Sequence, residues 1–153
     1  MLKTKEAIEQ RRSIRRFKSE PVPDENIMSL LEAARLAPSG SNAQPWRFKI
    51  VKDKETKFKL SRAAYNQQFI ADAPVVLVCC ADIKGYLDGT VSGIQDLGKI
   101  GAIEDRIKNI ILERVNDMMK GTVERLGDRI ALNVAIAVEH IMLRALDFGI
   151  GSC

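Results

Sequence analysis

Hydrophobic residues recur along this chain at helical spacing in several segments and at strand spacing in two. After Asp24, four apolar side chains fall at positions i, i+3, i+4 and i+7 (Ile27, Leu30, Leu31, Ala34). This spacing predicts an amphipathic helix that Asp24 caps and Pro38 ends. A shorter helix over 5–10 precedes it, with Thr4 as its N-cap. Helices therefore account for much of the first forty residues.

Two segments have the pattern of β-strands. Apolar and charged residues alternate over 46–50, which is typical of a half-buried strand. Residues 74–81 form a continuous apolar run, which predicts a strand buried on both faces and makes Cys79 and Cys80 core residues. A helix over 54–64 lies between the two strands. Because two strands make a marginal sheet, either a partner chain completes it or the sequence lacks a C-terminal piece.

The second half of the chain predicts a loop and two helices. Residues 85–101 hold five glycines and predict a mobile loop or lid, followed by a charged helical pattern over 103–126. Asp128 is placed to cap a longer helix over 129–148, and Gly149 follows that helix as a natural C-cap. The longer helix is apolar nearly all round, which indicates burial in a core or between subunits.

The net charge of +4 is focused at one end of the chain. With 153 residues, 46% hydrophobic and 29% charged, the composition suits a single globular domain over 1–153. The first twenty residues contain seven basic and three acidic side chains, so they carry the whole net charge. A nucleic-acid binder more often spreads a basic face over its domain. The focused charge therefore favours a small anionic ligand over nucleic acid.

The sequence lacks the usual signals of secreted, membrane and metal-binding proteins. The sequence has no apolar signal-peptide core and no run of membrane-spanning length. An odd count of three cysteines fits a reducing compartment, so we expect a cytoplasmic protein. A single histidine, His140, makes a metal site or a histidine-based triad improbable and is read as a satisfied interior or interface residue. The common glycine-rich phosphate loops are missing as well.

Two segments carry candidate binding chemistry. Residues 11–17 place four guanidinium groups and a hydroxyl within six positions, and the guanidinium fork matches phosphate oxygens. A solvated basic turn is the alternative. Residues 38–46 offer hydroxyl and amide groups and end in Trp46; they suit a connecting loop, but could also edge a planar ligand. If a cofactor carried the chemistry, such a site would need few ionisable groups, which fits a chain with no obvious nucleophile or general base.

These segments, with two others, resemble the nitroreductase family of flavin mononucleotide (FMN) enzymes. The matching stretches are 11–17, 37–46, 72–76 and 139–153, in the family's order. The resemblance implies an α+β fold of three α/β/α layers, with helices flanking a central, mostly antiparallel sheet. It also implies a homodimer whose interface contains the long helix 129–148. Substrate access would be set by the variable region 85–126.

The resemblance further implies which residues bind FMN. The phosphate and ribityl chain would be bound by one group of four residues (Arg11, Arg12, Ser13, Arg15). The isoalloxazine ring, in the flavin held mainly by the other protomer, would be lined by a second group (Pro38, Ser39, Gly40, Asn42). Gln67 or Asn66 would approach the ring. No residue is assigned a catalytic role and no metal is expected, because FMN carries the chemistry.

The implied reaction is ping-pong hydride transfer between two small molecules. NAD(P)H would reduce FMN and leave, and a nitroaromatic, quinone or similar acceptor would then take the electrons. A flavin-dependent reductive dehalogenase-type enzyme and a flavin-binding protein without turnover are the alternatives. Family members usually continue past the turn at 149–153 with a tryptophan, further strands and a basic residue near the flavin. None of these follows Cys153, so we expect a fragment or a naturally short form.

Overall fold

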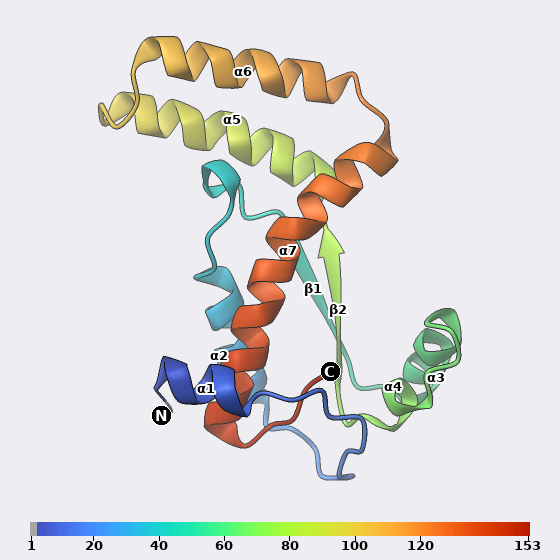
Figure 1. Cartoon of the computed structure of the whole chain (residues 1–153). Helices are drawn as coiled ribbons and strands as arrows, with labels where there is room; N and C mark the ends of the chain where they lie inside the picture. The colour runs from blue at the N-terminus through green and yellow to red at the C-terminus, as the bar shows by residue number, and fades with distance from the viewer. Residues whose placement is uncertain (1–2) are drawn as a thin grey trace. The chain divides into compact units, whose positions relative to one another are not determined.

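The computed structural model, drawn in Figure 1, describes residues 3–153, except the side chains of Met119 and Arg129. The chain forms two compact units. The first unit takes in the chain up to Leu36, together with 48–79 and 138–153. The second unit consists of 37–47 and 80–137. The chain passes between the units several times, so each unit is assembled from segments that are distant in the sequence.

The helices predicted in the first half of the chain are confirmed. They are α1 (Thr4–Gln10), α2 (Asp24–Arg35) and α3 (Lys54–Ala63), all in the first unit. The short α4 (Gln68–Asp72), in the same unit, was not predicted. The amphipathic stripe of α2 points inward, since Ile27, Leu30 and Ala34 are at most 5% exposed. Thr4 and Asp24, the predicted N-caps, are the first residues of their helices. The N-cap positions are occupied by the preceding residues, Lys3 and Pro23.

The two predicted strands pair with each other. β1 (Trp46–Val51) and β2 (Val76–Ala81) form a two-stranded antiparallel sheet (Figure 1). β1 has the expected alternation, in which Trp46 is buried and Arg47 is exposed. The prediction that β2 is buried on both faces is wrong, because Cys79 and Cys80 are exposed. Within the part of the chain that the structure describes, β2 has no sheet neighbour besides β1, so its far edge stays open.

Residues 85–101 do not form the predicted mobile loop, because α5 (Ile83–Lys99) covers almost all of them. Asp82 caps this helix, and its Oδ1 accepts a hydrogen bond from the Gly85 N–H at 2.7 Å. Glycine weakens a helix by about 1 kcal/mol relative to alanine, which is why five glycines suggested a loop. Three of them lie at intervals of four residues and so share one helix face (Gly85, Gly89, Gly93).

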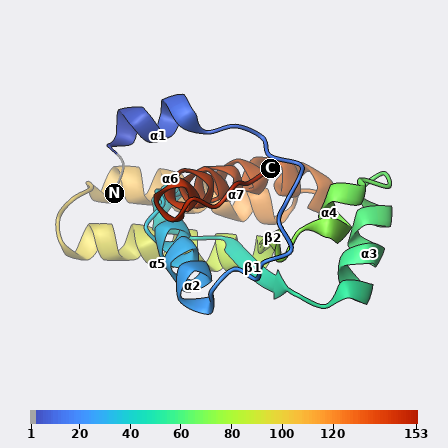
Figure 2. The same cartoon turned by 90° about the horizontal axis from the view of Figure 1, so that it is seen from below.

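The remaining helices also correct two predicted boundaries. α6 (Asp105–Met119) lies beside α5 in both views, and α7 (Val123–Ala145) is followed by the 3-10 turn η2 (Leu146–Phe148) (Figures 1 and 2). Asp128 lies inside α7 and does not cap it. The helix starts earlier because the chain turns at Gly121, and the Thr122 hydroxyl then accepts a hydrogen bond from the Arg125 N–H at 3.4 Å. Gly149 has the left-handed φ of 66° expected of a C-cap.

One face of α7 is buried and another is open. Ile130 and Ala137 are fully buried, and Ile130 packs with Tyr86, Leu126 and Ala43 in the core of the second unit. Leu132 and Ile136, by contrast, are 69% and 40% exposed. None of the helices in the described residues is long and apolar enough to span a membrane.

A buried lysine ties α3 to the end of α4 in the first unit. Lys57 is 6% exposed, and its ammonium group donates a hydrogen bond of 2.5 Å to the carbonyl of Ala73, the C-cap of α4. We expect Lys57→Ala to lower the free energy of unfolding by about 1.5–3 kcal/mol, because the carbonyl would lose a charged donor. Urea unfolding measures this loss. The exposed Lys54→Ala is the control, with a change within about 0.5 kcal/mol, and equal losses at both positions would contradict the prediction.

Candidate functional site

The arginine segment, residues 11–17, lies outside the helices and strands and is anchored to the last residues of the chain by an isolated β-bridge. Arg11 ends α1, and its N–H donates to the carbonyl of Ala7 at 3.0 Å. Ser13 then pairs in parallel with Ser152, and the Ile14 N–H donates to the Ser152 carbonyl at 2.9 Å. The segment is therefore tied to the C-terminal residues at Ser13 and Ile14, while the side chains of Arg12, Arg15 and Arg16 stay exposed.

A glycine makes this close approach possible. A Cβ at Gly151 would lie 2.9 Å from Cγ1 of Ile14, closer than real Cβ contacts allow. Two of the four stretches that resemble the nitroreductase family, 11–17 and 139–153, thus meet in the first unit. This contact could not be predicted from the sequence, because a parallel pairing between residues so far apart leaves no local pattern.

Within the residues that the structure describes, the guanidinium groups of the arginine segment have no carboxylate partner. Arg12 donates two hydrogen bonds of 2.7 Å, to the carbonyls of Glu9 and Arg11, so its charge stays at the end of α1. The Arg15 guanidinium lies over the ring of Phe69, 5.8 Å from its centroid. No ion pair in the described part of the chain involves the segment's arginines. This donor set, with the exposed Ser13 hydroxyl, fits a phosphate group.

Arg16 has different surroundings from the other three arginines. It lines a groove of about 790 Å³ in the first unit, beside Phe17, β2 and the C-terminal residues. The lining is mainly apolar, with Val76, Leu77 and Ile141 among its residues. Arg16 is accordingly left out of the set that would bind a phosphate.

Gln67 lies in the first unit, at the N-cap of α4. Its Nε2 donates to the Ala64 carbonyl at 2.9 Å. Tyr65 and Asn66, the two residues before it, both have a left-handed φ of 58°. Because the Arg15 guanidinium lies over the ring of Phe69 in α4, the start of this helix contacts the arginine segment. Sequence reasoning placed Gln67 near a flavin ring, and the structure fixes one of its two amide donors by a local hydrogen bond.

The residues predicted to line the ring lie together in the second unit, in the loop 38–44. This loop includes the 3-10 turn η1 (Gly40–Asn42), and three of its residues have a positive φ (Ser41 52°, Asn42 53°, Gln44 47°). Such angles are uncommon outside glycine and cluster at functional sites. Ser39 Oγ accepts from the Gln44 N–H at 2.9 Å, and Gln44 Nε2 donates to Asn42 Oδ1 at 3.1 Å. The loop is therefore tightly folded and not a slack connection.

Asn133 is a site residue that sequence reasoning missed. Its Oδ1, projecting from α7, accepts a hydrogen bond of 3.0 Å from the Gly40 N–H. The sequence did carry a weak signal, since Asn133 is a polar residue within the otherwise apolar run from Ile130 to Val138. That signal could not identify a partner 93 positions away.

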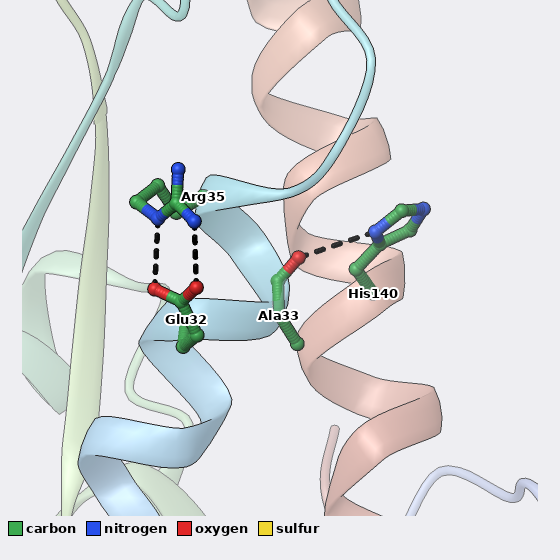
Figure 3. A network of polar contacts seen from close by, with 4 residues as sticks. All are labelled: Glu32, Ala33, Arg35 and His140. Atoms are coloured by element: carbon green, nitrogen blue, oxygen red, sulfur yellow. Dashed lines mark hydrogen bonds and ion pairs between the residues drawn. The ribbon is translucent and has the colours of Figure 1, made fainter.

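A polar cluster on α2 and α7 has a structural role (Figure 3). Nδ1 of the half-buried His140 lies 3.2 Å from the Ala33 carbonyl, and because a carbonyl only accepts, Nδ1 carries a hydrogen. On the neighbouring turn, Arg35 donates hydrogen bonds of 2.8 and 2.7 Å to the Glu32 carboxylate. These bonds lower the pKa of Glu32 and raise the pKa of Arg35. The histidine is thus satisfied by the fold, as its sequence context predicts.

Comparisons with known proteins agree with the sequence pattern. A family model described as "Nitroreductase family" matches residues 8–153. An NADH dehydrogenase of Thermus thermophilus is 47% identical over 57% of this chain and 42% of its own length. The putative NAD(P)H nitroreductase YodC of Bacillus subtilis is 29% identical over 100% of this chain and 75% of its own length.

A solved structure gives the same result in three dimensions. A putative nitroreductase from Exiguobacterium sibiricum, in complex with FMN, superposes with a TM-score of 0.68 at 26% identity. The match covers 95% of this chain and 70% of that one. The matched region thus extends over less than half of the Thermus protein and over about seven tenths of the solved structure.

Proposed function

This chain belongs to the nitroreductase family, and we propose that it is an oxidoreductase that binds FMN and passes electrons from NAD(P)H to a small organic acceptor. The observation that carries the proposal is the anchored arginine segment, whose guanidinium groups have no carboxylate partner in the described chain. The FMN complex of a related structure and the NAD(P)H nitroreductase named among the relatives support the choice of cofactor and reductant.

The chain's own residues would bind and orient, and FMN would supply the redox chemistry. When bound, FMN would take a hydride from NAD(P)H in one half-reaction and give the electrons to a nitroaromatic, quinone or similar acceptor in the other, a ping-pong sequence. Arg11, Arg12 and Ser13 would hold the phosphate by charge-assisted hydrogen bonds, and Arg15 would add its charge from above Phe69. The phosphate would thereby fix one end of the cofactor.

The ring end would be oriented by amide and backbone groups. Pro38, Ser39, Gly40 and Asn42, in the folded loop 38–44, would line the ring of the flavin that is held mainly by the other protomer. Gln67 has one Nε2 donor engaged by Ala64, so its Oε1 could accept a hydrogen bond from a ring N–H while the second Nε2 donor stays available. Rigid polar groups of this kind fix which face of a planar cofactor meets its substrates.

A visible spectrum and an anaerobic titration test this proposal. The purified protein, reconstituted with FMN, should show a flavin absorption band that bleaches when NAD(P)H is added without air. A band that persists would indicate a flavin-binding protein without turnover. A colourless protein that cannot be reconstituted would refute both functions. After bleaching, adding a quinone or a nitroaromatic should restore the band if electrons pass to such acceptors.

We also propose that the protein acts as a homodimer through α7. Leu132 and Ile136 lie four positions apart and so share one face of the helix, where they are 69% and 40% exposed. An apolar helix face open to solvent is typical of a subunit interface. The resemblance to the nitroreductase family points to the same helix.

Leu132→Glu is expected to convert the dimer to a monomer, because an unpaired carboxylate in an apolar interface loses its hydration. Sedimentation equilibrium measures the shift, which should exceed tenfold in the dimer dissociation constant, an effect of about 1.4 kcal/mol or more. Glu113→Gln, an exposed position on α6, is the control. A Leu132→Glu variant that remains dimeric would show that this face is not the interface.

A further inference from the structure

The loop 38–44 packs directly on the glycine face of α5 (Ile83–Lys99) in the second unit. A Cβ at Gly93 would lie 2.1 Å from the carbonyl oxygen of Ser41, and one at Gly89 would lie 2.7 Å from that of Ala43. The atoms in the way belong to the backbone, so they cannot swing aside as the end of a flexible side chain would. The two glycines are therefore needed for this approach, which accounts for their presence inside a helix.

α7 holds the same loop from a second direction. Asn133 Oδ1 accepts the Gly40 N–H at 3.0 Å, and a Cβ built on Gly40 would lie 3.7 Å from the buried Tyr86 hydroxyl of α5. Gly40 is thus held between a side chain of α7 and a side chain of α5. The contact is specific, because the amide oxygen of Asn133 satisfies one named backbone donor.

The loop needs such support because its own backbone is strained. Ser41, Asn42 and Gln44 all have φ values between 47° and 53°, a region that side-chain-bearing residues seldom occupy. Strained conformations persist where the surrounding structure over-determines them. Hydrogen bonds inside the loop join Gln44 to Ser39 and Asn42, and the Ala43 N–H to the Gly40 carbonyl. The Gly40 N–H and the Ser41 carbonyl, by contrast, meet Asn133 and Gly93, which lie outside the loop.

We infer that Asn133, Gly89 and Gly93 are positioning residues that set the shape of loop 38–44 and, through it, the recognition of the flavin ring. The part that concerns the flavin rests on the proposed function. None of the three is suggested to contact the cofactor. They determine where Ser39, Gly40 and Asn42 present their polar groups.

The support of loop 38–44 by Asn133, Gly89 and Gly93 is tested first in the flavin-free protein. Hydrogen exchange at residues 40–44, with the fluorescence of the single tryptophan, Trp46, reports the loop directly. Asn133→Ala should speed exchange at Gly40 by about 5- to 30-fold, and Gly93→Ala should speed it across the loop and shift the Trp46 emission. Asn133→Asp keeps an acceptor oxygen and should restore slow exchange.

Two control variants show whether the effect on the loop comes from these positions or from the type of substitution. Gly98→Ala adds the same methyl group to α5 but faces only the flexible Lys108 side chain at 3.2 Å, so loop exchange should not change. Asn116→Ala makes the same change as Asn133→Ala at an exposed position on α6 and should have no effect either. Slow loop exchange in both Gly93→Ala and Asn133→Ala would overturn the inference.

The consequence for the flavin is tested by comparing FMN with riboflavin, which has the ring but no phosphate. Gly93→Ala and Asn133→Ala should weaken both ligands by the same factor, about 5- to 30-fold, because the change lies at the ring. Unchanged affinities beside a faster-exchanging loop would overturn the positioning role. If the unaltered protein binds neither ligand, the proposed function fails, and the three residues have no role in flavin recognition. The exchange data still decide whether these residues hold the loop.

Discussion

Arg11→Ala and Arg15→Ala are each expected to weaken FMN binding by about 1.5–3 kcal/mol, or about 10- to 150-fold in the dissociation constant. Each substitution removes a charge-assisted hydrogen bond to the phosphate, whose negative charge is then less well neutralised. Neither arginine has a carboxylate partner in the described chain, so neither substitution breaks an ion pair of the fold, although Arg15→Ala also removes the contact with the Phe69 ring. Fluorescence titration of the flavin-free protein measures both constants.

Riboflavin and an exposed arginine provide the controls for this prediction. Because riboflavin lacks the phosphate, its affinity should stay the same in both variants. Arg62→Ala removes an exposed guanidinium from α3, in the same unit, and should leave FMN binding unchanged. If both variants bind FMN as tightly as the unaltered protein, the arginine segment is not the phosphate site. If riboflavin weakens in parallel with FMN, the substitutions have altered the ring end and not the phosphate end.

Ile130→Ala is expected to destabilise the second unit by about 2–5 kcal/mol, since a fully buried isoleucine would be replaced by a cavity. The neighbours of Ile130 are Tyr86 and Leu126, together with Ala43 from the end of the candidate loop. The substitution should therefore also loosen that loop. Urea unfolding measures the stability, and Trp46 fluorescence follows the loop in the same experiment.

Ile100→Ala is the matched control for the core prediction. It deletes the same atoms, but Ile100 is 77% exposed at the C-terminal end of α5. Its removal should change the free energy of unfolding by no more than about 0.5 kcal/mol. A similar loss at the two positions would mean that the cluster around Ile130 is not the core that stabilises this unit.

Local patterns in the sequence were sufficient for most helices and for both strands. The i, i+3, i+4, i+7 spacing after Asp24 predicted α2 and its buried face, and the alternation over 46–50 predicted β1. These predictions hold because which residues share one face of a helix or strand depends on the period of that element alone. The family was identified from the sequence for a related reason, since its motifs are contiguous stretches.

The same local reasoning failed where neighbours decide the outcome. The glycines of 85–101 indicated a loop by composition, yet four of the five lie in α5, where Gly89 and Gly93 leave the space that the backbone of loop 38–44 occupies. The apolar run 74–81 indicated a doubly buried strand, yet Cys79 and Cys80 are exposed, because β1 is the single sheet neighbour of β2 in the described chain. In both cases the missing information was the identity of the packing partner.

For the site, the sequence by itself determined the chemistry: four arginines and a serine suited to a phosphate, and a polar loop suited to a planar ring. Side-chain chemistry is a property of each residue and can be read without a fold. The tertiary structure decided how these groups are held. It anchors the arginine segment on Ser152, rests Arg15 on Phe69 and supports the loop with α5 and Asn133. Such contacts join residues far apart in the chain, and only folding brings them together.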